Sequence, residues 1–460
     1  MPILAGYIVP HPPLIVPAVG RGEEQKIQAT IDAYRQVARK IAELAPDVII
    51  LSSPHATAYG DYFHLDPSPT LSGSLTMFRA PQVSASVDNA LELVERIASE
   101  ATVRDISLGT LGDKHAPLDH GALVPLHFIL REYKDFQMVR LSPSGLPAID
   151  HYQVGMMIRD VIPENTNVVW VASGDLSHKL KKDGPYGLAK EGPVFDKQIT
   201  EAMASGDFQT FLKFDTAFCH KAAECGLGSF TMMAGAFDGH SVESKLLSHE
   251  GPFGVGYAVA SFKPLNKDEK RCFLKRYVEE KQHELDTLKS KSDAYVNLAR
   301  ASLEHYIRHN KPLSIPRGLP REMTSEKAGV FVSIHKDGRL RGCIGTIRPT
   351  TSSVAKEIIE NAISAGTRDY RFSPIKEREL SRLEYSVDVL MPPEDIDSED
   401  RLDVTKYGVI VRSGHRSGLL LPNLDGIDTI EEQVRIARQK AGIRDGESYT
   451  LQRFEVIRHH

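Results

Sequence analysis

Cysteine is scarce in this sequence of 460 residues, which contains only Cys219, Cys225, Cys272 and Cys343. Thiols so few and so scattered exclude a disulfide-stapled scaffold and a zinc site built from cysteines alone, and they fit a reducing compartment. Long apolar runs are missing too, since no segment approaches the roughly 18 apolar residues of a membrane-spanning helix. Residues 1–13 have no basic segment and contain prolines, so we expect no signal peptide and a cytoplasmic location.

An excess of charge of one sign is also missing. Lys and Arg number 56 and Asp and Glu number 61, which gives a net charge of -5. This balance argues against a surface that coats nucleic acid. The rest of the composition, 41% hydrophobic and 25% charged, is that of an ordinary globular protein. A chain of 460 residues is too long for one hydrophobic core, so we expect at least two domains.

Residues 1–262 alternate between predicted strands and predicted helices. Apolar residues at helical spacing mark residues 23–44, 89–100, 149–161 and 193–214, and apolar runs predict strands at 48–51, 137–141, 168–171, 242–247 and 255–262. This alternation predicts an α/β domain with a mostly parallel sheet covered by helices on both faces. Tyr59 to Pro81 lacks such periodicity, and we expect an irregular functional loop there.

The following segment, residues 263–292, is dense in mixed charge and poor in apolar residues. We interpret it as an exposed, partly helical connector between domains 1–262 and 293–460. The second domain begins with a predicted helix at 293–309, and Lys336-Asp337-Gly338 predicts a hairpin turn. Further strands and two more helices follow, which predicts an α+β domain.

Three predicted strands of the first domain are each followed within a few residues by a histidine. The runs are residues 3–9, 48–51 and 168–171, and the histidines are His11, His55 and His178. Asp175 lies between the third run and its histidine. Open α/β sheets bind ligands beyond the carboxyl ends of their strands, so we expect one cleft to collect these side chains.

Two imidazoles and a carboxylate form the facial triad that suits non-haem Fe(II). His11 and His55 are the candidate imidazoles, and Glu224 is the carboxylate that we favour. The polar residues left for proton transfer are His120, Asp175 and His178. Each has an ordinary structural alternative, because a histidine after a strand commonly lies in an exposed loop and an aspartate there commonly caps a helix.

Five motifs occur in a specific order: PHPP, SPH, DHG, SGDLSH and ECG. Together they resemble the class III (LigB-type) extradiol ring-cleavage dioxygenases and the related Memo family, over about residues 1–262. The resemblance implies Fe(II) held by His11, His55 and Glu224. It also implies that His120 and His178 act on a small aromatic substrate, a catechol-like or aminophenol-like ring, with dioxygen as the second substrate.

In Memo-like proteins a cysteine before a glycine lines the metal site, which makes Cys225 the alternative ligand. Asp175 is expected to orient His178, as carboxylates commonly orient imidazoles. Two other functions remain open: a Memo-like metal-binding or redox module without ring cleavage, and a hydrolase using Zn(II) or another divalent metal on the same ligands. Metal analysis and oxygen uptake distinguish them.

The second domain resembles the AMMECR family over about residues 293–457. The motifs are LRGCIG at 340–345, Arg368-Asp369 and SGLLLP at 417–422. The family has no settled activity. We expect a polar pocket formed by Arg341, Cys343, Arg368 and Asp369; the alternative is a tight β-bend around a buried structural cysteine.

Memo-like and AMMECR-like proteins are known as companions of a radical-SAM protein. The fusion of the two domains in one chain therefore implies a radical-SAM protein as a partner. The sequence does not define the oligomeric state, and a homo-oligomer is one possibility. It also does not show whether the terminal His459-His460 are native.

Overall fold

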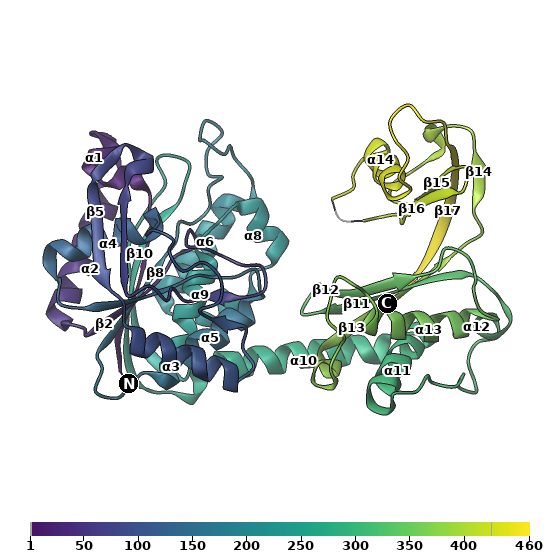
Figure 1. The fold of residues 1–460 in the computed structure, drawn as a ribbon, viewed down its shortest axis with the longest axis horizontal. Coiled ribbons are helices and arrows are strands. Elements are labelled where there is room, and N and C mark those ends of the chain that lie inside the picture. The colour runs from purple at the N-terminus through teal and green to yellow at the C-terminus, as the bar shows by residue number, and fades with distance from the viewer. Residues whose placement is uncertain (1, 425) are drawn as a thin grey trace. The chain divides into compact units, whose positions relative to one another are not determined.

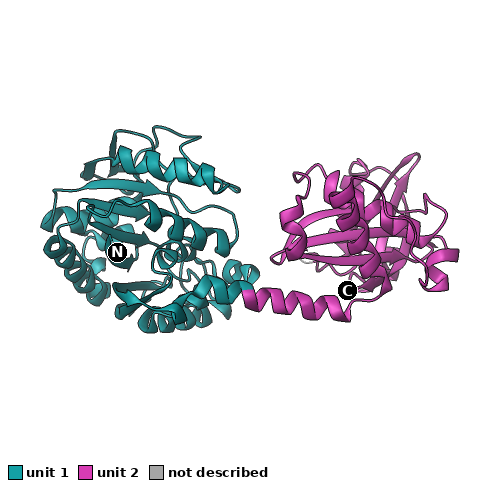
Figure 2. Cartoon of the chain, turned by 90° about the horizontal axis from the view of Figure 1, so that it is seen from below, with its two compact units in different colours: residues 1–278 teal, residues 279–460 magenta. Residues whose placement is uncertain are grey.

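The computed structural model describes residues 2–424 and 426–460. The chain divides into two compact units, Met1–Val278 and Glu279–His460 (Figure 2). Within the described ranges, no helix combines the length and apolarity needed to cross a membrane.

The first unit is built on a six-stranded sheet in the order β7-β2-β8-β1-β10-β9. The strands are β7 (Gln137–Leu141), β2 (Val48–Ser52), β8 (Val168–Ser173), β1 (Ile3–Val9), β10 (Tyr257–Lys267) and β9 (His240–Glu250). The first four are parallel, and β10 and β9 add an antiparallel edge. The predicted mostly parallel α/β sheet is therefore confirmed.

Helices cover both faces of this sheet (Figure 1). On one face lie α3 (Leu91–Val103), α5 (Ala148–Val161), α6 (Glu191–Ser205), α7 (Phe208–Lys213), α8 (Thr216–Ala222) and α9 (Leu227–Ala236). On the other lie α2 (Gln28–Leu44) and α4 (His120–Glu132), with the short α1 (Pro17–Gly20) nearby. Successive β8 residues alternate between the two cores, Val168 and Trp170 in one and Val169 and Val171 in the other, which is the period of a strand buried on both sides.

The expectation of an irregular loop at residues 59–81 is wrong. This part of the chain forms β3 (Phe63–His64), which pairs with β6 (Leu108–Gly109), and then a hairpin of β4 (Thr70–Leu75) and β5 (Ala80–Asp88). Leu71, Leu75 and Val87 of the hairpin join the core that contains α4. The serines, threonines and glycine between them concealed the two-residue period in the sequence.

The second unit contains an antiparallel sheet in the order β12-β11-β13-β17-β15-β16, with β14 also paired to β17. The strands are β11 (Gly329–Lys336), β12 (Arg339–Gly345), β13 (Leu383–Leu390), β14 (Glu394–Ile396), β15 (Tyr407–Ser413), β16 (Arg416–Leu420) and β17 (Thr450–His459). The helices are α11 (Ala294–His309), α12 (Arg321–Ser325), α13 (Val354–Thr367) and α14 (Ile430–Lys440). The predicted α+β class of this domain is confirmed.

The charged segment at residues 263–292 is more ordered than a simple connector. Strand β10 continues to Lys267, and α10 runs from Phe273 to Lys291. The division between the two units, at Val278 and Glu279, falls within this helix. The expected boundaries at residues 262 and 293 stay predictions.

Candidate functional site

The three histidine-bearing loops follow adjacent parallel strands. β8 pairs with β1 on one side and with β2 on the other, and their final residues are in register. His11 follows β1, His55 follows β2, and His178 follows β8. Because parallel strands end at the same edge of a sheet, all three loops lie at one end of the domain. The structure thus brings the three predicted histidines together.

Three side chains form a candidate metal centre: His11, His55 and Cys225. Their ligand atoms all lie within 4.8 Å of one another. The Nε2 atoms of the two histidines are 3.0 Å apart, and Cys225 Sγ is 3.6 Å from His11 Nε2. Nitrogen and sulfur ligands about 2.0 to 2.3 Å from one ion are separated by roughly 3 to 4 Å. The residues therefore fit a metal ion.

His11 is held in the form and orientation that metal binding requires. Its Nδ1 lies 3.0 Å from Ser173 Oγ, which leaves Nε2 directed at the cluster. The side chain is buried, and this burial, helped by the neighbouring His55, lowers its pKa to about 3. His11 is consequently neutral at physiological pH, and a neutral imidazole is the form that ligates metal.

Glu224, the favoured carboxylate ligand, is placed differently. It precedes α9, and its Oε2 accepts a hydrogen bond of 2.7 Å from the backbone N–H of Leu227. Burial raises its pKa to about 7. Among the described residues its carboxylate is not part of the converging group, whereas the thiol of Cys225 is. The geometry therefore favours Cys225, the alternative ligand, over Glu224.

His120 and His178 adjoin the centre without belonging to the converging group. The ring of His120 lies 4.1 Å from that of His55, centroid to centroid. His178 Nε2 is 3.9 Å from Cys225 Sγ, and its ring stacks on Tyr186 at 5.1 Å. Burial is the main cause that lowers the pKa of His120 to about 3, and the nearby imidazoles lower it further. Burial lowers the pKa of His178 as well, against the opposing charge of Asp175. Both rings are therefore available as proton acceptors.

Asp175 does not make the expected bond to His178. Its Oδ1 accepts a 2.8 Å hydrogen bond from the backbone N–H of His11, and its own N–H lies 3.3 Å from Cys225 Sγ. Burial raises the pKa of this carboxyl to about 6. Asp175 thus links the loops that carry His11 and Cys225, and this is a different role from orienting His178.

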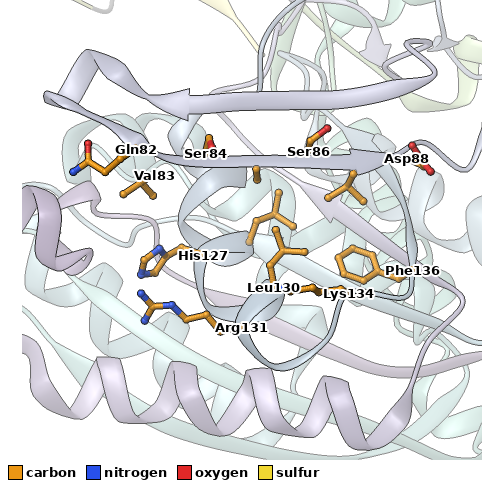
Figure 3. Close-up of a pocket in the computed structure, with 13 residues that line it drawn as sticks. Gln82, Val83, Ser84, Ser86, Asp88, His127, Leu130, Arg131, Lys134 and Phe136 are labelled. Atoms are coloured by element: carbon orange, nitrogen blue, oxygen red, sulfur yellow. The ribbon is translucent and has the colours of Figure 1, made fainter.

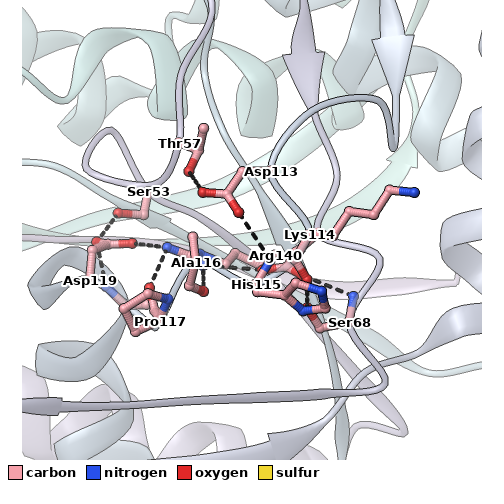
Figure 4. Close-up of polar contacts among 12 residues, drawn as sticks. Ser53, Thr57, Ser68, Asp113, Lys114, His115, Ala116, Pro117, Asp119 and Arg140 are labelled. Atoms are coloured by element: carbon pink, nitrogen blue, oxygen red, sulfur yellow. Dashed lines mark hydrogen bonds and ion pairs between the residues drawn. The ribbon is translucent and has the colours of Figure 1, made fainter.

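A buried arginine, which the sequence interpretation missed, fixes the loop before His120 (Figure 4). Arg140 of β7 donates to Asp66 at 3.2 Å and to Asp119 at 2.8 Å. It also donates to the carbonyl oxygens of residues 116 and 117. Asp119 accepts a 2.6 Å bond from Ser53 Oγ and caps α4 through the N–H of residue 122. A charged residue inside an apolar strand was the signal that could have revealed this network.

Two cavities lie beside the β4–β5 hairpin. One, of about 880 Å³, is lined by His55, Asp119 and Arg140 together with residues of the hairpin, so it adjoins the candidate metal centre. The other, of about 650 Å³, lies between β5 and α4, where His127 and Arg131 line it (Figure 3). The second cavity contains none of the predicted site residues.

The polar pocket predicted in the second unit is assembled in part. Asp369 accepts a 2.9 Å bond from the backbone N–H of Cys343 and pairs with Arg371 at 2.7 Å. Arg341 instead pairs with Glu379 at 3.1 Å. Arg368 is exposed at the end of α13. Burial raises the pKa of the Cys343 thiol, so this cysteine is protonated at neutral pH. Glu379 was missed because its partners, Lys336 and Arg341, are distant in sequence. Arg371 was missed although it lies only two residues from Asp369.

A mostly parallel sheet whose strand ends carry imidazoles and a thiol at metal-binding separations defines an α/β domain with a candidate metal centre. Residues 5–260 match the family of the catalytic LigB subunit of aromatic ring-opening dioxygenase, and the chain belongs to this family. Residues 296–459 match the AMMECR1 family. The resemblances to the LigB-type dioxygenases and to the AMMECR family are confirmed.

The fusion of the two domains also occurs in a relative. The chain is 42% identical over 464 residues to a protein of Clostridium acetobutylicum, with 98% of each chain covered. A protein of Thermotoga maritima is 47% identical over 167 residues, which are 36% of this chain and 96% of that protein. The crystal structure of an uncharacterized protein from Pyrococcus horikoshii has 32% identity over 36% of this chain and 88% of its own, with a TM-score of 0.34.

Proposed function

We propose that the first unit is a metal-dependent oxidoreductase that opens a catechol-like or aminophenol-like ring with dioxygen. The observation that carries the proposal is the convergence of the His11 and His55 imidazoles, with His120 and His178 beside them but outside the ligand group. A bound metal such as Fe(II) would supply bidentate binding of the ring substituents and a position for dioxygen. Family membership supports the same reaction class.

The two remaining histidines would handle protons. His178 is neutral because burial lowers its pKa, so its ring can accept a proton from a ring hydroxyl. Tyr186, stacked on it, restricts the orientation of that ring. His120 contacts the rings of His55 and Phe78, and as a neutral ring it would first accept a proton and then return it to the opened product. General acid and base groups of this kind each contribute roughly 10²- to 10⁴-fold in rate.

A second candidate is a Memo-like metal-binding or redox module that does not open rings. The observation in its favour is the Cys225 thiol at the centre, because thiolate ligands suit zinc or Cu(I) better than oxygen-active Fe(II). In this case the second unit would serve as the interaction scaffold for a radical-SAM protein. Retention of Fe(II) by Glu224 would instead require its carboxylate to leave the α9 backbone.

Metal analysis after anaerobic purification, followed by oxygen uptake with catechols and aminophenols, tests the proposal. Iron together with ring-dependent oxygen uptake is the expected result. Iron or copper without uptake would support the redox module, and zinc without uptake would support a hydrolytic centre. Either of the last two outcomes overturns ring opening as the activity.

A further inference from the structure

The 880 Å³ cavity adjoins the candidate metal centre. His55 belongs to both, and Asp119, which also lines the cavity, directly precedes His120. The volume falls within the range of about 300 to 1,000 Å³ that is typical of pockets for drug-sized ligands. A single aromatic ring beside the centre would therefore leave most of this space for a substituent.

The β4–β5 hairpin supplies one wall of this cavity, and the wall is rich in hydroxyl groups. Ser72 is in register with Ser86, and Ser74 with Ser84, so the four side chains lie in two neighbouring pairs along the wall. The backbone N–H of Leu118 donates a 2.8 Å hydrogen bond to the carbonyl of Ser72, which fixes residues 116–118 alongside the hairpin. The side chains of residues 116–118, which also line the cavity, are apolar.

The charges that line the cavity leave no free cation for an anionic ligand. Arg140 and Asp119 are the charged lining residues, and they are paired with each other. Arg140 also pairs with Asp66, so one guanidinium faces two carboxylates. Among the side chains that line the cavity, an anionic substituent would find no unpaired cation, whereas an uncharged substituent needs none.

We infer that this cavity binds the substituent of the ring substrate, and that the substituent is uncharged and hydrogen-bonding, such as an amide or a hydroxyl-bearing chain. The inference rests on the proposed function, because the ring end of the substrate is assigned to the metal centre. Hydroxyl side chains donate and accept hydrogen bonds without charge, and the apolar wall accommodates the carbon chain.

The test compares the affinities of catechol with those of the amide and the carboxylate of dihydroxyphenylpropionic acid. These two acid derivatives are nearly isosteric and differ in charge. Calorimetric titration of the full chain loaded with Fe(II), under anaerobic conditions, should show the amide binding about tenfold more tightly than the carboxylate and more tightly than catechol. Ser72→Tyr, at an exposed strand position, should reduce the ratio of amide to catechol affinity toward one. Ser99→Tyr, on the exposed face of α3, is the matched control and should keep the ratio.

Equal or tighter binding of the carboxylate, or an unchanged ratio in Ser72→Tyr, would overturn the inference. Failure of the proposed function would give a different result. Ring compounds would bind without altering the optical spectrum of the bound metal, but the protein would still prefer the amide, and this preference would still depend on Ser72. In that event the cavity stands as a binding site and ring opening does not.

Discussion

Cys225 and Glu224 are adjacent, and the turn between α8 and α9 decides which of them reaches the histidines. Ala223 has a positive φ of 54°, and the Glu224 carboxylate turns back onto the start of α9. The sequence could narrow the third ligand to these two residues, but the choice depends on a backbone turn that neighbouring residue types do not specify. The histidines were predictable because each follows a strand of plain apolar composition.

Replacing the two residues separately tests this assignment. Cys225→Ser should weaken metal binding at least about tenfold, because it removes the strongest ligand type of the centre. Glu224→Ala should leave metal content nearly unchanged and cost some stability through loss of the hydrogen bond from the Leu227 N–H at the start of α9, about 1 kcal/mol. Metal content per chain, measured by mass spectrometry after dialysis at neutral pH, gives the answer. A metal-free alanine variant with a loaded serine variant would restore Glu224 as the ligand.

The histidines divide into ligands and proton carriers, and substitution separates the two groups. His55→Ala should lose the metal, since His55 Nε2 belongs to the converging group. His178→Ala should retain the metal and lose roughly 10²- to 10⁴-fold in turnover. Parallel metal analysis and rate measurement on the two variants check this division. Equal loss of metal from both would place His178 among the ligands.

At the level of elements, the bounds of strands with simple apolar runs were predicted closely, whereas strands that contain many small polar residues were not recognised. The strand expected at residues 137–141 matches β7, whereas the β4–β5 hairpin was mistaken for a loop. The arginine inside an apolar strand was a visible signal, but its partners could not be identified from sequence alone, because Asp66 and Asp119 lie 74 and 21 residues away from it. Its consequence is that Arg140 connects β7 to the start of α4 through Asp119, and Asp119 extends the connection to the His55 loop through Ser53.

Removing that side chain should destabilise the first unit strongly. Arg140→Met leaves Asp66 and Asp119 buried without their cation, a change that typically costs about 3 to 5 kcal/mol. Arg35→Met is the control, because Arg35 is 54% exposed and pairs with Asp32 on the surface of α2; it should cost less than about 1 kcal/mol. Urea unfolding followed by the fluorescence of Trp170, the single tryptophan, reports on the first unit. Similar midpoints for the two variants would contradict the role of the network.

In the second unit, Glu379 ties β11 and β12 to the turn at residues 377–382. Burial alone would raise its pKa, but the hydrogen bond from Arg341 and the charge of Lys336 outweigh burial and lower it to about 2. A carboxyl with a lowered folded-state pKa stabilises the fold above its unfolded pKa of about 4.3, and this contribution is lost as pH falls toward 2. We expect a contribution on the order of 2 kcal/mol at neutral pH.

Glu379→Gln should therefore be less stable than the parent chain at pH 7, and the difference should shrink between pH 4.5 and pH 2. Circular dichroism follows both units, so a transition absent from Trp170 fluorescence belongs to the second unit. Glu377→Gln, on the same turn and 72% exposed, is the control and should show almost no difference. A stability difference for Glu379→Gln that is independent of pH would rule out the ionic contribution.

At the scale of the whole molecule, two units were predictable from length and from the charged segment that separates the two family matches. The precise boundary was not, because strand β10 and helix α10 continue into that segment. Within the described residues, every hydrophobic cluster draws its members from one unit alone: two clusters belong to the first unit and three to the second. Each unit therefore completes its own cores.

Separate cores predict that the units survive separation. Residues 278–281 in the middle of α10 are exposed and largely charged, so a protease that recognises lysine should cut the native chain near Lys281 once the helix opens locally. We expect two fragments that each unfold cooperatively, the first retaining the native fluorescence of buried Trp170 and the candidate metal centre. Mass spectrometry locates the cut, and thermal unfolding of the purified fragments tests their independence. Loss of cooperative unfolding in either fragment would mean that one unit depends on the other, and the expected division of the chain at its charged segment would then be wrong.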